Sequence, residues 1–236
     1  MNNNTPTTEI IDNIVQKAKI AQLEFEKYNQ EQVDEVVTAV AWSICNPTHN
    51  KLISDLAVNT TSLGKADDKI VKNKRKTLGL LRDLKNAKTV GVIKEDKEKG
   101  IVEIAKPVGV VAAVTPSTNP AATPINNILN AIKGRNSIVV SPSPSGLKVF
   151  QELLHYINQE LNKIKAPINL IQTLPSPVSK DLTKELMKQV DLVIVTGSQS
   201  NVREAYSSGT PAIGVGQGNV TVIVDETCDL KDAAKK

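Results

Sequence analysis

A chain of 236 residues with 40% hydrophobic side chains is long enough to bury a sizeable core, as one large domain or somewhat more. The net charge of +4 is mild, the basic residues are scattered and only 3% of residues are aromatic, which argues against a nucleic-acid partner. Two widely spaced cysteines and the lack of a long apolar run argue against a disulfide scaffold and a membrane span, so we expect a cytoplasmic protein.

The N-terminal part, residues 1–87, is predicted to be helical. After a polar tail, apolar residues recur at helical spacing from Glu9 onward, and the pattern returns in residues 30–44, 49–61 and 65–84. None of these segments carries a chemical motif. Four helices before any strand predict a layer that covers one face of a later sheet.

Residues 88–106 predict a β-hairpin. Two apolar segments, Thr89–Ile93 and Ile101–Ile104, flank a charged turn that ends at Gly100. Charge at the turn keeps such an arm from aggregating. From these residues alone, a solvated surface hairpin is a sufficient interpretation.

The stretch from Lys106 to Pro144 predicts one β–α–β unit. Val108–Val114 is a short valine-rich run, typical of a strand buried on both faces, and residues 137–141 form a second such run. Residues 121–132 between them have apolar residues at helical spacing. Ligands of open parallel sheets bind beyond the carboxyl ends of the strands, where the loops TPSTNP and SPSP follow.

The alternation of helices and strands continues to the end of the chain. Helices are expected over residues 145–163, 178–190 and 201–208, and strands over residues 168–172, 191–195, 211–215 and 220–225. Residues 107–236 therefore predict an α/β fold with a doubly wound parallel sheet.

Two of the predicted loops could carry chemistry. Thr196–Ser198 (TGS) joins a strand to a helix, where unpaired N–H groups and a glycine favour a bound phosphate, although TGS is also an ordinary helix cap. Asn119 lies in a loop stiffened by Pro116 and Pro120, and its amide could stabilise a developing oxyanion. The alternative is a turn asparagine bonded to its own backbone. GVGQGN, from Gly214, lacks the spacing of a phosphate-binding loop.

Three segments carry a resemblance to a known family: KPVGVVAAVTPSTNP, AIKGRNSIVVSPSP and AYSSGTPAIGVGQGN. They resemble the CoA-acylating branch of the aldehyde dehydrogenase superfamily, most closely its succinate-semialdehyde and sulfoacetaldehyde type, over about Glu9 to Ala234. The resemblance implies NAD or NADP as cofactor, coenzyme A and a small-molecule aldehyde as substrates, and a homo-oligomer formed through residues 88–106. It also implies that the nucleophilic cysteine lies beyond Lys236, so that this chain alone is inactive.

The resemblance assigns roles to individual residues. It implies that Asn119 helps to hold the oxyanion of the tetrahedral intermediate and that TGS cradles the dinucleotide pyrophosphate. No metal is implied. The cofactor-binding positions that it implies are Thr115, Pro116, Ser117, Ser141, Ser143, Thr196, Gly197, Ser198, Gly214 and Gly216.

Two positions depart from the family pattern. Hydrolytic members have a glutamate base where this chain has Gly214, and without it the acyl group survives until a thiol takes it. Relatives usually have histidine at the position of Ser143, so cofactor affinity and preference stay open. Cys45 and Cys228 lie in no matching motif. The rival hypothesis is a catalytically inactive homologue that acts as a nucleotide-binding or subunit-interaction domain.

Overall fold

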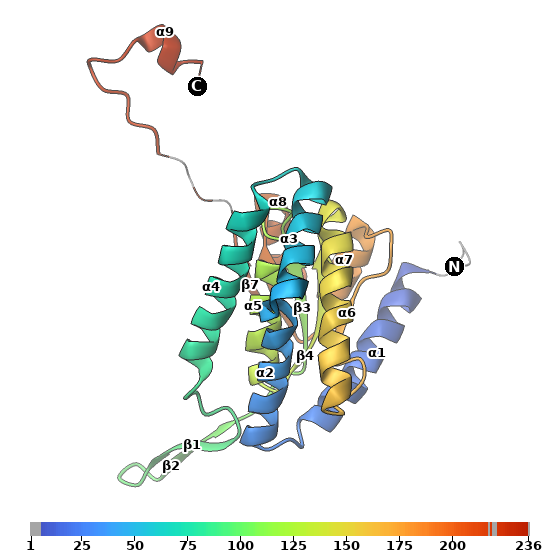
Figure 1. Ribbon diagram of the computed structural model, residues 1–236. Coiled ribbons are helices and arrows are strands. Elements are labelled where there is room, and N and C mark those ends of the chain that lie inside the picture. Colours follow the sequence, from blue (N-terminus) through green and yellow to red (C-terminus); the bar gives the residue numbers. More distant parts are fainter. Residues whose placement is uncertain (1–5, 217, 219–220, 236) are drawn as a thin grey trace.

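The computed structural model describes residues 6–216, 218 and 221–235. Figure 1 shows a central sheet between helices, a hairpin that projects from the body, and a C-terminal segment that leads away from it. The five-stranded sheet is parallel throughout, with the order β5-β4-β3-β6-β7. Its strands are β3 (Val110–Thr115), β4 (Ser137–Pro142), β5 (Ile171–Thr173), β6 (Leu192–Thr196) and β7 (Ala212–Val215).

The connections run outward from β3 in both directions. The chain passes through α5 (Ala122–Lys133) to β4 and through α6 (Leu147–Lys163) to β5. It then returns through α7 (Lys180–Gln189) to β6, on the other side of β3, and continues through α8 (Gln199–Tyr206) to β7. This order confirms the predicted doubly wound parallel sheet. The point where the winding reverses, between β3 and β6, is where such sheets bind ligands.

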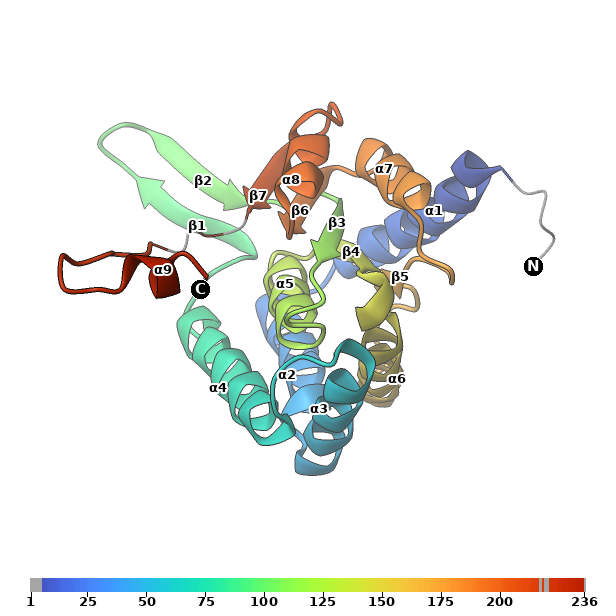
Figure 2. The same cartoon turned by 90° about the horizontal axis from the view of Figure 1, so that it is seen from above.

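The four N-terminal helices divide between the two faces of the sheet. α1 (Thr7–Phe25) packs beside α7, whereas α2 (Gln30–Cys45) packs against α5 and α6 on the other face. On that second face, α3 (Pro47–Thr61) and α4 (Ala66–Leu84) form an outer layer, as Figure 2 shows. The expectation of one layer over one face was therefore wrong for α1.

The burial of β3 explains why both faces need helices. Val111 and Ala113 belong to the apolar cluster that includes α2, α5 and α6, whereas Val110 and Ala112 belong to the cluster that includes α1 and α7. Successive side chains of a strand point to opposite faces, so an apolar strand must be covered twice. The helical period shows that a helix has a buried face, but not which side of the sheet it covers.

Capping side chains set the helix starts that the sequence misplaced. Asn46 accepts hydrogen bonds from the N–H groups of Thr48 and His49, at 3.0 and 3.4 Å, and so starts α3 at Pro47, two residues before the predicted start. At α7, Ser179 Oγ accepts from the Leu182 N–H at 3.1 Å, so the helix begins two residues later than expected.

The predicted hairpin is confirmed as an antiparallel pair, β1 (Gly91–Asp96) and β2 (Ile101–Ala105). Its base is tied to the body by Arg135, whose guanidinium donates to the Ala105 carbonyl at 3.0 Å and to the Glu26 carbonyl at 2.8 Å. Ile101 and Ile104 are 51% and 57% exposed. The arm therefore presents apolar side chains to its surroundings.

The expected strand over residues 220–225 does not form within its described part. Residues 221–225 have no strand structure, and Val220 lies outside the described residues. Val222 and Ile223 are 76% and 87% exposed. A strand needs a neighbouring strand to pair with, and this segment leads away from the sheet toward α9 (Leu230–Ala233) in Figure 1.

Across the described part of the chain, no helix combines the length and the apolar character needed to cross a membrane. The His, Cys, Asp and Glu side chains of the same residues form no group of three that could hold a metal ion.

The entry to β3 depends on Gly109. This residue has a φ of 124°, and a Cβ there would lie 2.2 Å from Asp191 Oδ2. The same oxygen accepts the Val110 N–H at 2.7 Å, so Asp191 cannot move without losing that bond. We expect Gly109→Ala to lower the free energy of unfolding by roughly 2–4 kcal/mol, from backbone strain and the lost hydrogen bond.

Urea denaturation measures this change, and Gly79→Ala is the matched control. Gly79 lies within α4, and an added Cβ there meets no atom within 4 Å. Alanine should raise the free energy of unfolding by about 0.5–1 kcal/mol at such a helical position. Equal effects of the two substitutions would contradict the role given to Gly109.

Candidate functional site

A cavity of about 680 Å³ lies at the carboxyl ends of the parallel strands, at the reversal point between β3 and β6. Strand ends meet there because all five strands run in the same direction. The cavity brings together Asn119 and nearly all the predicted cofactor positions. Those on its lining are Thr115, Pro116, Ser117, Ser141, Ser143, Thr196, Gly197, Ser198 and Gly216.

The TGS turn forms the N-terminal end of α8. Ser198 caps the helix by accepting the Asn201 N–H at 3.3 Å, and the Gly197 N–H donates to the Val215 carbonyl at 3.1 Å, which ties the turn to β7. A Cβ on Gly197 would come no closer than 3.4 Å to another group, so the space in front of this turn is open. First-turn N–H groups lack partners within a helix and carry partial positive charge, which suits an anion.

Three hydroxyl groups at the ends of β3 and β4 differ in their hydrogen bonding. Thr115 Oγ1 is buried without a partner among the described residues. Ser141 Oγ lies 2.8 Å from Thr183 Oγ1, and Ser143 Oγ accepts the Gly146 N–H at 3.2 Å. Thr115 is therefore a donor without an acceptor at the strand end, and Ser143 keeps its own O–H to donate to a ligand.

Two cations in the wall of this cavity were not among the residues predicted for the site. Lys180 and Lys184 extend from the first turns of α7. Lys184 pairs with Glu204 of α8 at 2.9 Å, whereas Lys180 has no ion-pair partner among the residues that the structure describes. Positions 180 and 184 fall on one face of a helix, so the spacing carried a signal.

Asn119 is held by a lysine from another helix. Its Oδ1 accepts a hydrogen bond from Lys72 Nζ of α4, and its backbone carbonyl accepts the Thr123 N–H at 3.3 Å. Because the amide oxygen faces Lys72, the amide NH₂ is left for a further acceptor. Lys69, one turn earlier on α4, is buried, and burial together with the charge of Lys72 lowers the pKa of its ammonium group. Lys72 and Asn119 are 47 positions apart, too far for a local pattern to connect them.

Gly214 faces α8, and it is not among the described residues that line the cavity. A Cβ there would lie 2.8 Å from Val202 Cγ1 and 3.0 Å from Tyr206 Cε2. Its N–H donates to Tyr206 Oη at 3.2 Å. The close backbone approach that this glycine allows is therefore made with a helix. Of the same motif, Gln217 and Asn219 lie outside the described residues.

Neither cysteine lines the cavity. Cys45 ends α2 and packs against the apolar core, and burial raises the pKa of its thiol despite the opposing charge of Lys74. Cys228 lies in the segment of residues 221–235 that leads away from the sheet in Figure 1.

Comparison with known proteins identifies the family of the chain. The aldehyde dehydrogenase family matches residues 3–236. The chain is 54% identical over 228 residues to the sulfoacetaldehyde dehydrogenase (acylating) of Cupriavidus necator, covering 97% of this chain and 46% of that protein. It is 45% identical over 225 residues to the succinate-semialdehyde dehydrogenase (acetylating) of Clostridium kluyveri, covering 95% and 49%. The chain thus spans about half the length of the curated relatives it matches.

Solved structures share the fold. An acetylating aldehyde dehydrogenase from Geobacillus thermoglucosidasius has a TM-score of 0.86 at 37% identity, covering 97% of this chain and 50% of that one. A propionaldehyde dehydrogenase from Rhodopseudomonas palustris with bound CoA and an acylated cysteine has a TM-score of 0.78 at 30% identity, covering 95% and 51%. An engineered glycolyl-CoA reductase with bound NADP⁺ has the same score and identity, covering 95% and 50%. The resemblance recognised in the sequence is confirmed, and the chain belongs to the aldehyde dehydrogenase family.

Proposed function

We propose that the chain is the N-terminal, cofactor-binding part of an NAD(P)-dependent acylating aldehyde dehydrogenase. The complete enzyme would convert an aldehyde, coenzyme A and NAD(P)⁺ into an acyl-CoA, NAD(P)H and a proton. The observation that carries this proposal is the convergence of Asn119 and the TGS turn on one cavity. The acylating names of the relatives support the reaction type.

The residues around the cavity fit a nicotinamide dinucleotide. The first turn of α8 offers N–H groups to a pyrophosphate. Lys180 adds a positive charge that has no ion-pair partner among the described residues. Thr115 supplies a buried hydroxyl without a partner in the described chain. When bound, the cofactor supplies the acceptor for the hydride that leaves the aldehyde carbon. We propose that Ser143 donates to a ribose hydroxyl in place of the family's histidine.

Asn119 is proposed to stabilise the oxyanion that forms when a thiolate attacks the aldehyde carbon. The hydrogen bond from Lys72 to Oδ1 turns the amide NH₂ away from α4 and polarises it. A donor held in this way by a lysine and a proline-rich loop needs little reorganisation during the reaction. Lys72 would act as a positioning residue, because it reaches the substrate through Asn119.

Gly214 is proposed to favour acylation because it has no carboxylate side chain. With no carboxylate at this position, no base activates water against the thioester, so the acyl group remains for the thiol of coenzyme A. The packing of Gly214 against Val202 and Tyr206 also leaves no room for a larger side chain facing α8.

The test of this function is cofactor reduction that depends on coenzyme A. It uses the extended protein, in which this chain continues through its downstream coding sequence. With propionaldehyde, succinate semialdehyde or sulfoacetaldehyde, we expect NAD(P)⁺ to be reduced only when coenzyme A is present. Equal rates without coenzyme A would contradict acylation. The absence of reduction with every aldehyde, despite cofactor binding, would favour the inactive, nucleotide-binding homologue.

We also propose that the hairpin joins the chain to a second copy of itself. A two-stranded sheet with exposed apolar side chains is marginal alone, so it should pair with a partner sheet. Changing both Ile101 and Ile104 to lysine should weaken self-association at least tenfold, about 1.4 kcal/mol, measured by light scattering over a concentration series. The control is Val71→Lys, at a 63% exposed position on α4, which should leave association unchanged. A monomer before and after the hairpin change would contradict the proposal.

A further inference from the structure

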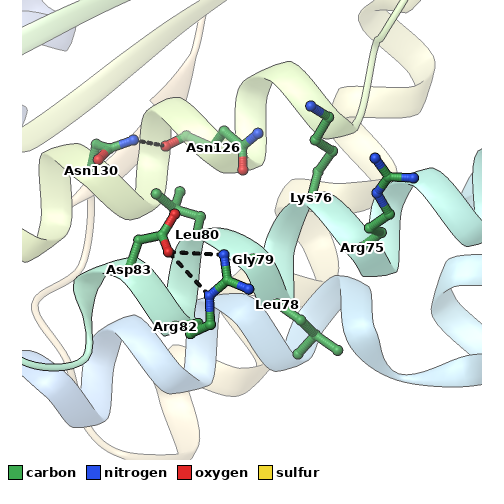
Figure 3. A pocket seen from close by; sticks show the side chains of 9 residues that line it. All are labelled: Arg75, Lys76, Leu78, Gly79, Leu80, Arg82, Asp83, Asn126 and Asn130. Carbon is green, nitrogen blue, oxygen red and sulfur yellow. Dashed lines mark hydrogen bonds and ion pairs between the residues drawn. The ribbon is translucent and has the colours of Figure 1, made fainter.

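Cations that have no ion-pair partner among the described residues line two separate hollows. One hollow, of about 640 Å³, lies between α4 and α5, as Figure 3 shows. Arg82 pairs there with its neighbour Asp83 at 3.1 Å, whereas Arg75 and Lys76 have no such partner in the described chain. Its described lining includes no strand end and no part of the TGS turn. These cations are therefore not placed to meet a ligand that the TGS turn holds.

The other hollow is the cavity of about 680 Å³ at the strand ends, where the free cation is Lys180. Among the lining residues that the structure describes, Glu204 alone has a carboxylate, and it pairs with Lys184 at 2.9 Å. No described carboxylate is left in the lining to neutralise Lys180 or to repel an anion. The cavity therefore keeps one positive charge at the start of α7.

Lys180 lies at the end of β4, close to Ser143. Thr183, one turn after Lys180 on α7, has its Oγ1 at 2.8 Å from Ser141 Oγ, which holds this turn of α7 against the end of β4. Residues three apart on a helix lie on the same side, so Lys180 faces the same strand end. Ser143 follows Ser141 by two residues, and all of these residues line the cavity. Lys180 and Ser143 thus flank the same part of it.

The two faces of the sheet indicate how a dinucleotide would lie in the cavity. Asn119 precedes α5, which packs on one face, whereas α7 and α8 pack on the other. With the pyrophosphate at the TGS turn and the nicotinamide beside Asn119, the adenosine half would extend along α7 and α8. Its ribose would then meet Ser143, and Lys180 would face the same sugar.

The charge beside this ribose decides between the two nicotinamide cofactors. NAD has a hydroxyl group on the 2′ carbon, to which a carboxylate can bond, whereas NADP has a phosphate there. A phosphate monoester carries a charge of about −1.5 to −2 at neutral pH. We propose that Lys180 binds this 2′-phosphate, so that the chain prefers NADP(H) to NAD(H). The inference rests on the proposed function and deepens it by naming the cofactor and the residue that selects it.

Calorimetric titration of residues 1–236 with NADP⁺ and NAD⁺ measures this preference. The unmodified chain should bind NADP⁺ roughly 10- to 100-fold more tightly, the range expected for one hydrogen bond between charged groups. Lys180→Gln should weaken NADP⁺ binding by the same factor and change NAD⁺ binding by less than about twofold. Lys188→Gln, on the same helix but outside the described lining, is the matched control. Lys76→Gln, which removes a free cation from the hollow in Figure 3, is the second control. Neither control should change either Kd.

Fragments of the two coenzymes identify the phosphate that Lys180 contacts, because coenzyme A also carries a ribose phosphate, on the 3′ carbon. Adenosine 2′,5′-bisphosphate corresponds to the adenosine end of NADP, and adenosine 3′,5′-bisphosphate to that of coenzyme A. The 2′,5′ compound should displace NADP⁺ more readily than the 3′,5′ compound or 5′-AMP, and Lys180→Gln should remove this advantage. Stronger displacement by the 3′,5′ compound would overturn the inference, since Lys180 would then serve coenzyme A.

A charge reversal tests the same assignment in the opposite direction. Lys180→Glu should make NAD⁺ the preferred nucleotide, because a carboxylate repels a 2′-phosphate and accepts a hydrogen bond from a 2′-hydroxyl group. Equal affinities of the unmodified chain for both nucleotides, tighter binding of NAD⁺, or equal losses for both in Lys180→Gln would overturn the inference and leave the proposed function intact. If neither nucleotide binds, the proposed function fails and this inference fails with it.

Discussion

Replacing Asn119 by alanine in the extended protein is expected to lower kcat by roughly 10²- to 10³-fold, the usual cost of removing one oxyanion donor. The loss should fall on kcat more than on KM, because the amide bonds the oxygen most strongly when negative charge develops on it. Lys72→Met should cause a smaller loss of the same kind, since Asn119 would remain but its amide would no longer be held.

Steady-state kinetics with saturating coenzyme A measures both effects. Asn162→Ala, an exposed asparagine at the end of α6, is the control and should leave kcat unchanged. If Asn119→Ala lowered kcat by less than about threefold, Asn119 would not be an oxyanion donor. If Asn119→Ala lowered the Tm enough to account for the lost activity, the role of Asn119 would be structural instead.

The rate of aldehyde oxidation by residues 1–236 alone is expected to be at least about 10⁴-fold lower than that of the extended protein. The reaction needs a thiolate within bonding distance of the aldehyde carbon and beside the Asn119 amide. Cys45 is half-buried against the core, where burial raises the pKa of its thiol, and Cys228 lies in a segment that leads away from the sheet. Cys45→Ser and Cys228→Ser should each leave the activity of the extended protein unchanged. Turnover by residues 1–236 that Cys228→Ser abolishes would place the nucleophile in this chain.

Much of this fold could be predicted because its strands carry unambiguous patterns. Val110–Thr115 is buried along its whole length, and such an apolar run is typical of a central parallel strand. Gln30–Cys45 buries the valines expected from their spacing. The loops at the strand ends could be predicted to meet because the strands run parallel. This prediction requires no knowledge of side-chain contacts.

The failures have a different physical origin. The face of the sheet that α1 covers depends on tertiary packing, and the strand expected at residues 220–225 depends on a partner edge. Local patterns contain neither kind of information. The same limit hid Lys72, whose contact with Asn119 joins α4 to a loop far along the chain. Lys180 was within reach of the strand-end argument, because it lies in the first turn of a helix that follows a strand.

The central claim is that the TGS turn and its cavity bind a nicotinamide dinucleotide, and calorimetric titration of residues 1–236 with NAD⁺, NADH and NADPH tests it most directly. We expect binding of at least one, with a Kd on the order of 10 µM to 1 mM. Gly197→Asp should weaken it at least tenfold by placing a negative charge where the pyrophosphate would lie, and the open space there accommodates the new side chain. Ser207→Asp, at the other end of α8, should leave the Kd unchanged. Absence of heat and of any rise in Tm with all three nucleotides would contradict the assignment.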